Sequence, residues 1–115
     1  MDRIRRFKYK SDTFNLTTTN VTTVLTCPAD ATLLVKSLQA VHDTASNVDT
    51  HALLTKSGGS AIKIGYKELN KTQANMVEET LAMEASDVLS MQAGTANEIT
   101  GVVSYALIDR SQENG

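Results

Sequence analysis

Two histidines and one cysteine are the side chains of this sequence best suited to nucleophilic or metal chemistry. A zinc site needs about four ligands, usually in closely spaced pairs, and His42, His51 and Cys27 do not form such pairs, so we expect no metal site. Neither a cation nor a histidine adjoins Cys27 in the sequence to activate its thiol. We therefore predict that Cys27 is a small buried apolar group and that both histidines are ordinary strand or loop residues.

Two groups of acidic residues could act as a general acid and base. Glu78-Glu79, and Glu84 with Asp87, supply the paired carboxylates that glycosidases use. Such enzymes stack sugars on aromatic side chains, yet this sequence has no Trp, three Tyr and two Phe. These acids are therefore predicted to form a solvated edge. The segment 57–60, Ser-Gly-Gly-Ser, lacks the Lys-Ser/Thr of a phosphate loop and is predicted to be a hairpin turn, so no catalytic residue and no cofactor is expected.

The elements that would have to position any site are short strands separated by turns. Residues 21–41 have the pattern of a strand, a tight turn at Pro28-Ala29-Asp30 and a second strand, which the pattern predicts over residues 31–43, although a helix is also compatible with its spacing. Residues 48–54 and 62–66 each have alternating apolar positions around the paired glycines and predict a hairpin. Residues 102–108 form a nearly continuous apolar run, which is typical of a covered central strand.

The segment 76–91 has two interpretations. Its Glu, Ala, Met and Leu residues favour a helix, whereas the short apolar intervals on either side of Ala85-Ser86-Asp87 favour two strands joined by a turn, and we prefer the strands. Residues 68–75 are polar and are predicted to be a loop. Seven or eight short strands with few helical segments predict an all-β protein, an antiparallel β-sandwich of the jelly-roll or immunoglobulin-like kind.

Charge is distributed unevenly along the 115 residues. Residues 1–10 hold five of the eleven cations and one of the thirteen acids, a net charge of +4, so the other residues carry −6. We predict a basic arm over residues 1–12, a β-sandwich domain over 13–110 and a flexible tail over 111–115. The acidic body makes nucleic acid an unlikely partner, and the arm is expected to contact a like subunit. The candidate contact residues are Arg3, Arg5, Arg6, Phe7, Lys8 and Tyr9.

The single cysteine cannot form an intrachain disulfide, which fits a reducing compartment. The polar residues Ser11, Asp12 and Thr13 stand where a signal peptide would need an apolar run, and no stretch approaches the ~20 apolar residues of a membrane span. We therefore expect a soluble cytoplasmic product without a membrane partner.

The motifs of residues 25–38 resemble those of small virion proteins of tailed bacteriophages. That family has a strand ending in Val-Pro-Ala-Gly, then Thr-x-x-Val-Lys-Ser-Ile, a hairpin with Ser-Gly-Gly, and Leu-Glu-Ala-Gly-Asp-x-Leu. The similar segments here are Cys27-Pro28-Ala29-Asp30, Thr32-Leu33-Leu34-Val35-Lys36-Ser37-Leu38, Ser57-Gly58-Gly59, Met83-Glu84-Ala85-Ser86-Asp87-Val88-Leu89 and Val102-Val103-Ser104-Tyr105. Asp30 and Ser86 replace glycines of the family pattern, and the proline turn usual before its Glu-rich strand is absent.

The resemblance covers residues 20–109 and implies a non-enzymatic structural subunit of a virion, assembled in the host bacterial cytoplasm and placed at the capsid surface, neck or tail. Its implied partners are other virion proteins and copies of itself, through strand edges and the arm. The alternative is a carbohydrate- or receptor-binding sandwich module of a fibre or adhesin, which would need exposed aromatics on one face. A small sandwich enzyme would need a nucleophile and base pair that one Cys and two His do not provide.

Overall fold

A computed structural model describes residues 6–109, which form nine β-strands and no helix. Every strand pair is antiparallel, so the predicted all-β antiparallel sandwich is confirmed. The residues that the structure describes therefore contain no helix that is long and apolar enough to cross a membrane. The strands are β1 Arg6–Leu16, β2 Thr22–Thr26, β3 Ala31–His42, β4 Val48–Thr55, β5 Ala61–Leu69, β6 Thr72–Asn75, β7 Leu81–Met83, β8 Val88–Ala93 and β9 Ile99–Asp109.

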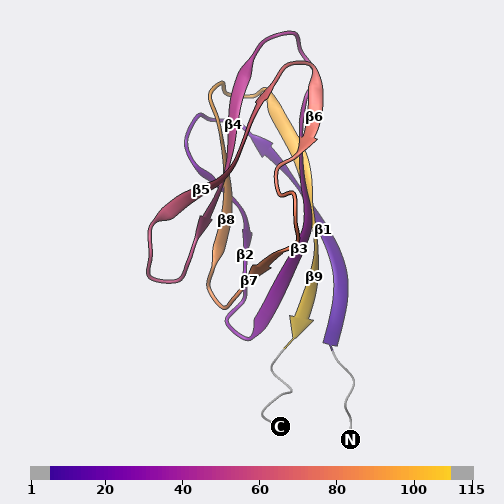
Figure 1. Ribbon diagram of the computed structural model, residues 1–115, viewed down its shortest axis with the longest axis vertical. Coiled ribbons are helices and arrows are strands. Elements are labelled where there is room, and N and C mark those ends of the chain that lie inside the picture. The colour runs from indigo at the N-terminus through magenta and orange to yellow at the C-terminus, as the bar shows by residue number, and fades with distance from the viewer. Residues whose placement is uncertain (1–5, 110–115) are drawn as a thin grey trace, which may run out of the picture.

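The strands form two sheets (Figure 1). The larger sheet has the order β1-β9-β3-β6, with β7 pairing the other half of β3, and the smaller sheet has the order β2-β8-β4-β5. The edge strands β1 and β2 come together on one side of the sandwich, and β5 and β6 come together on the other. The sandwich thus has two lateral sides, which we call the β1 side and the β5 side.

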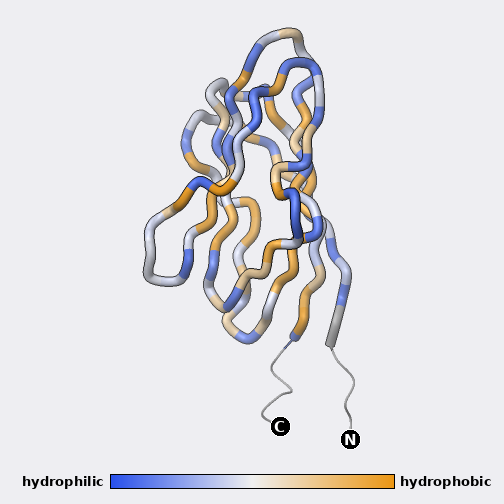
Figure 2. Tube along the Cα trace, in the orientation of Figure 1, coloured by the Kyte–Doolittle hydropathy of each residue, from blue (hydrophilic) through white to orange (hydrophobic). Residues whose placement is uncertain are grey.

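The core lies between the inward faces of both sheets. Leu33, Val35 and Leu38 of β3 are buried against Leu89 and Met91 of β8 in one apolar cluster. Figure 2 shows apolar residues alternating with polar ones along the strands, as expected where one face of a sheet is covered and the other is not. Burial of each such side chain contributes roughly 1.5–3 kcal/mol, so the paired inner faces supply the main stabilisation of the domain.

The predicted strand, turn and strand of segment 21–41 are confirmed as β2, the turn after Cys27 and β3. Since β2 belongs to the smaller sheet and β3 to the larger one, this turn carries the chain across the sandwich. One expectation about local structure is wrong. The polar segment 68–75 is not a loop, since β5 continues to Leu69 and Thr72–Asn75 forms β6. This short strand pairs with Gln39–His42 at the end of β3, and a polar edge strand has no apolar alternation to reveal it.

The predicted strands of the C-terminal half are confirmed. Segment 76–91 contains β7 and most of β8 rather than a helix, and the hairpin of β4 and β5 turns at Gly58, whose φ of 81° is a value that glycine adopts freely. The run predicted over 102–108 is β9, which lies between β1 and β3. Its outward positions, such as Val102 and Ser104, are half-buried rather than fully covered.

The N-terminal segment also forms a strand. From Arg6 to Leu16 the backbone pairs with β9 without a register shift, so residues 6–12 belong to the larger sheet rather than to an arm outside it. Alternation of Lys8 and Lys10 with Tyr9 is the strand signal that the charge pattern concealed. Residues 1–5 and 110–115 lie outside the described residues, and the division of the chain there stays a prediction.

The turn before Asp87 places Ser86 at a φ of 69°, in the left-handed region. That conformation costs an L-residue roughly 1–2 kcal/mol, and glycine avoids most of this cost while losing more freedom on folding. Replacing Ser86 by glycine should therefore raise the free energy of unfolding by about 0.5–1 kcal/mol in urea titrations. Ser60→Gly, an exposed loop serine without a positive φ, is the control and should give no gain; equal effects in both variants would contradict this explanation.

Candidate assembly surfaces

The structure keeps the two histidines and the cysteine apart and gives each a structural role. His42 is fully buried at the end of β3, where Nδ1 lies 3.2 Å from the carbonyl oxygen of Glu98 and Nε2 lies 2.8 Å from that of Ser46. The ring thus ties the loop after β3 to the turn before β9. His51 lies on β4 with its ring 5.0 Å from that of Tyr66. The hydroxyl oxygen of Ser46 also lies 3.1 Å from Nε2 of His42, so the buried ring is held by polar groups of the loop that follows β3.

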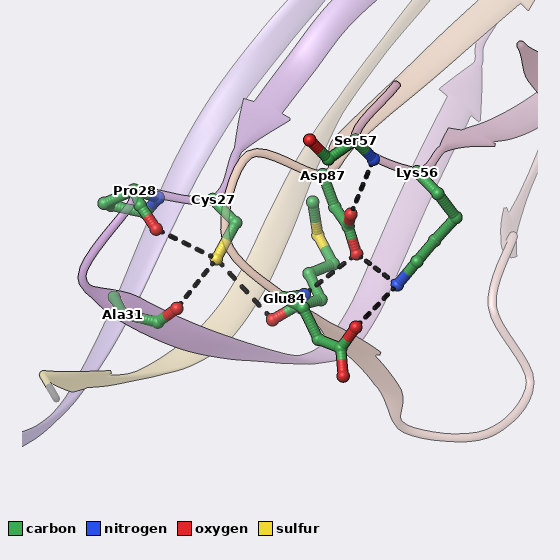
Figure 3. Close-up of polar contacts among 8 residues, drawn as sticks. Cys27, Pro28, Ala31, Lys56, Ser57, Glu84 and Asp87 are labelled. Carbon is green, nitrogen blue, oxygen red and sulfur yellow. Dashed lines mark hydrogen bonds and ion pairs between the residues drawn. The ribbon is translucent and has the colours of Figure 1, made fainter. Parts of the chain in front are cut away.

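Cys27 is the small buried group that the sequence predicts. It is 1% exposed, and its thiol contacts the carbonyl oxygens of Ala31 at 3.3 Å and Met83 at 3.5 Å (Figure 3). Its backbone pairs with the turn before β8, because Cys27 N–H donates to Asp87 O and Ser86 N–H donates to Cys27 O. Among residues 6–109, no group of three or more His, Cys, Asp or Glu side chains is placed to hold a metal ion.

Asp87 is the polar residue that sequence reasoning placed wrongly. Its side chain is 2% exposed rather than solvated, and it accepts hydrogen bonds from the backbone N–H groups of Glu84 at 2.9 Å and Ser57 at 3.2 Å. Lys56 Nζ lies 2.5 Å from Asp87 Oδ2 and 3.2 Å from the exposed carboxylate of Glu84 (Figure 3). We call Lys56, Ser57, Glu84 and Asp87 the clasp, because they join the β4–β5 hairpin to the turn between β7 and β8.

The contacts within the clasp favour the charged forms of Asp87 and Lys56. Burial by itself would raise the pKa of Asp87, but the ion pair with Lys56 and the two backbone N–H donors together lower the pKa below its ordinary value. Asp87 in turn is the main reason that the pKa of Lys56 is raised. No signal in the sequence distinguishes Asp87 from Glu84, because the backbone donors that bind the Asp87 carboxylate come together only in the folded chain.

The first candidate surface is the outer edge of β1. This strand is eleven residues long, pairs with β9 on one side and belongs to the edge of its sheet. Every residue from Lys8 to Thr13 is exposed, and Tyr9 is 73% exposed. Of the predicted contact residues, Arg6, Phe7, Lys8 and Tyr9 are therefore brought together on one strand, whereas Arg3 and Arg5 lie outside the described residues.

The C-terminal half of β1 is held more firmly than its N-terminal half. Tyr105 on β9 donates a hydrogen bond to Asp12 at 2.9 Å, and burial followed by this bond raises the pKa of Tyr105 to about 12. Phe14 and Leu16 reach the core cluster. The strand is therefore anchored at its C-terminal end, and its basic N-terminal end lies at the edge of the larger sheet.

The second candidate surface is β5, at the edge of the smaller sheet. Five large apolar side chains are exposed in the described residues, and Ile62, Ile64 and Tyr66 on β5 are three of them, at 61%, 40% and 53%. Single exposed apolar residues are ordinary, but three on one edge strand make β5 a candidate contact surface. The Tyr66 hydroxyl also donates to Asp49 at 2.9 Å, which fixes the ring across β4.

A groove runs beside β5. Its walls are residues 64–67 of β5 and the segment 76–81, and its volume is about 340 Å³. Segment 76–81 is held to the other sheet at its start, because Met76 N–H donates to Leu38 O at 2.7 Å. Lys67 Nζ lies 3.5 Å from the carboxylate of Glu78 across the groove. The sequence prediction of a solvated acidic edge holds for Glu78 and Glu79, which are exposed.

Comparisons with known proteins find the fold and no family. No protein-family model matches the sequence, and no curated protein matches it. A chain of the Bacillus endospore appendages, described as disulfide-linked pili, aligns at a TM-score of 0.52 and 11% identity over 96% of this chain and 93% of that chain. A chain of the acid-stable capsid of Helicobacter pylori bacteriophage KHP30 aligns at 0.53 and 11% identity over 94% and 95%.

These likenesses extend over nearly the whole chain in both directions, so they concern the complete sandwich rather than one motif. At 11% identity they show the fold alone. Both similar chains come from repetitive assemblies, a pilus and a capsid, and neither is described as an enzyme.

Proposed function

We propose that this chain is a non-enzymatic structural subunit that assembles with copies of itself, and with other structural proteins, into a virion or a surface appendage. The observation that carries the proposal is the β1 edge, an eleven-residue strand paired on one side and exposed from Lys8 to Thr13. Strand addition to such an edge supplies backbone hydrogen bonds without any special side chain. Both fold neighbours come from assemblies built in repetition, which agrees with this role.

Within that role we favour the virion of a tailed bacteriophage, at the capsid surface, neck or tail. The motif resemblance over residues 20–109 points there, and the buried thiol supports it. A pilus linked by disulfides needs a cysteine that a neighbouring subunit can reach, whereas Cys27 is the single cysteine and is 1% exposed. Strand edges and the basic N-terminal residues are then the means of assembly. The predicted contact residues remain Arg3, Arg5, Arg6, Phe7, Lys8 and Tyr9.

The placement of the tyrosines weighs against a carbohydrate-binding module. Tyr9 lies on β1 in the larger sheet, and Tyr66 lies on β5 in the smaller sheet, on the opposite lateral side of the sandwich. Tyr105 is 7% exposed and is occupied with Asp12. A sugar platform stacks rings on aromatics of one face, and these three residues do not share one.

The solution mass of the chain tests the proposal. Light scattering on the full chain should give an assembly larger than a monomer, and removal of residues 1–5 should reduce that mass without unfolding the sandwich. Removing residues 1–10 would be a poor test, because it also takes Arg6–Lys10 out of β1 and uncovers Tyr105–Asp109 of β9. A full chain that stays monomeric at every concentration tested, alone and with virion proteins, would overturn the proposed role.

A further inference from the structure

The groove beside β5 has the features of an acceptor for an extended peptide. The two walls meet closely at the bottom of the groove, because a Cβ atom added at Gly65 would lie 2.5 Å from the carbonyl oxygen of Met76. These two walls are attached to different sheets. One wall is β5 of the smaller sheet, and the other is segment 76–81, whose first residue is hydrogen-bonded to Leu38 of the larger sheet. The groove is therefore a fixed part of the β5 side rather than a gap between mobile loops.

The lining is partly apolar and partly polar, with an acidic rim. Ile64 exposes 40% of its surface along one wall, whereas the ring of Tyr66 lies across β4, beside His51. Glu78 and Glu79 stand exposed on the other wall, and Lys67 is paired with Glu78. No ion pair of Glu79 is found within the described part of the chain. A segment that alternates cations with apolar residues would match both properties.

Backbone pairing on β5 itself is disfavoured. The register between β4 and β5 shifts where Ala52 and Leu53 oppose Gly65 and Lys63, so Ile64 is the extra residue of a bulge that distorts the outer edge. Lys63 and Lys67 flank that bulge. The β1 edge of another copy would bring its own lysines against them, and like charges directly opposite destabilise a strand pair. The contact is thus expected in the groove, not along the strand.

The matching segment is at the start of the chain. Residues 1–5 read Met-Asp-Arg-Ile-Arg, with Ile4 between Arg3 and Arg5. Five extended residues span at most roughly 17 Å, which is enough to reach across one neighbouring surface. They precede β1, and β1 and β5 lie on opposite lateral sides of the sandwich. A contact between the two sides joins different surfaces of two copies, which builds a ring or a filament.

We propose that residues 1–5 of one copy bind in the groove between β5 and residues 76–81 of the next copy, with Ile4 against Ile64 and Leu81 and the arginines at Glu78 and Glu79. The inference rests on the proposed function, because it names a contact of the proposed self-assembly in addition to the β1 edge. The contact is head-to-tail, so each copy offers one segment and one groove.

Reciprocal charge reversal tests the contact. Arg3→Glu/Arg5→Glu and Glu78→Lys/Glu79→Lys should each weaken self-association at least about tenfold, because like charges then face each other. All four substitutions in one chain should restore association, and so should an equal mixture of the two double variants. The control is Asp30→Lys/Asp43→Lys, which reverses two exposed acids outside the groove and should leave association unchanged.

Cross-linking locates the contact directly. A photoreactive benzoylphenylalanine in place of Ile4 should couple to residues 64–67 or 76–81, and a mixture of light and ¹⁵N-labelled chains should show that the coupled peptides come from two copies. Association that survives all charge reversals, or cross-links that map elsewhere, would overturn the groove contact and leave the proposed function standing. A wild-type chain that stays monomeric at every concentration would overturn both.

Discussion

Replacing Asp87 by alanine should lower the free energy of unfolding by about 3 kcal/mol. The carboxylate is 2% exposed and accepts hydrogen bonds from the backbone N–H groups of Ser57 and Glu84, and both donors would lose this partly buried acceptor. Each unsatisfied buried group costs about 1–3 kcal/mol, and the Cβ-only side chain cannot replace either bond. Urea titrations at pH 7, followed by circular dichroism, give the difference.

A matched variant separates the buried acceptor from the surface charge. Glu84→Gln removes the other partner of Lys56, but Glu84 is 74% exposed, and exposed ion pairs contribute 0–1 kcal/mol. We therefore expect Glu84→Gln to stay within about 0.5 kcal/mol of the wild type. Comparable losses in both variants would show that the clasp acts through its net charge and not through the two backbone donors.

The same residue predicts a dependence on pH. Because the pKa of Asp87 is lowered in the folded chain, its contribution to stability is complete above the ordinary aspartate pKa and is lost as the pH falls through the depressed value. The gap in unfolding free energy between wild type and Asp87→Ala should thus be largest near neutral pH and shrink in acid. A gap that stays constant from neutral pH into strong acid would contradict a charged, hydrogen-bonded Asp87.

A substitution that weakens the contacts of the clasp should also change the β5 side. Lys56 and Ser57 begin the turn that leads into β5, and the clasp is their link to the turn between β7 and β8. The groove that we propose as an acceptor is formed by β5 and by segment 76–81, which leads into β7. A variant that weakens the clasp therefore affects both walls, so association of Asp87→Ala is best measured where the variant is still fully folded.

Apolar alternation in the sequence predicted the strands that have one buried face. It did not predict a strand whose conformation depends on the strand with which it pairs. The hairpin of β4 and β5 follows from the apolar alternation around Gly58 and Gly59, and both neighbours in the sequence are also neighbours in the sheet. In contrast, β6 has four residues without an apolar face, and its strand conformation comes from pairing with the end of β3. No window of residues 68–75 contains that information.

The sequence likewise does not predict to which of the two sheets each strand belongs. Val24 and Leu33 lie in successive strands with similar composition, but a turn at Pro28 sends them to different sheets. The candidate surfaces divide in the same way. Lys8 and Tyr9 are candidate contact residues because they lie in a basic segment of the sequence. The groove depends instead on Gly65 meeting Met76, a contact between segments that the hydrophobic pattern does not join.

Asp87 illustrates the limit for single polar residues. Glu84 and Asp87 stand three residues apart in one turn, and composition gives no reason to treat them differently. The structure exposes one and buries the other, because the backbone donors of Ser57 and Glu84 converge on the shorter side chain. A buried charge is tolerated where such donors exist, and their convergence is a property of the folded chain.

Replacing Gly101 by alanine should have an effect as large as the loss of Asp87. Gly101 lies in β9 opposite Phe14 of β1 and Ala40 of β3, at the centre of the larger sheet. An added Cβ would lie 2.0 Å from the carbonyl oxygen of Gln39 and 2.5 Å from Cζ of Phe14, so both neighbouring strands would have to move. We expect a loss of about 3 kcal/mol in unfolding free energy, at the upper end of the range for overpacked sites, measured by urea titration.

Two controls identify the cause of that loss. Gly94→Ala adds the same methyl group, but its nearest atom would be Asp49 O at 3.6 Å, which is an ordinary contact, so this variant should remain within about 1 kcal/mol of the wild type. Adding Phe14→Leu to Gly101→Ala removes the ring from the clash but leaves Gln39 O in place. Because a backbone carbonyl between paired strands cannot turn aside as a side chain can, the double variant should stay destabilised. Full recovery in that double variant would mean that the ring of Phe14, and not the spacing of β9 and β3, requires glycine at this position.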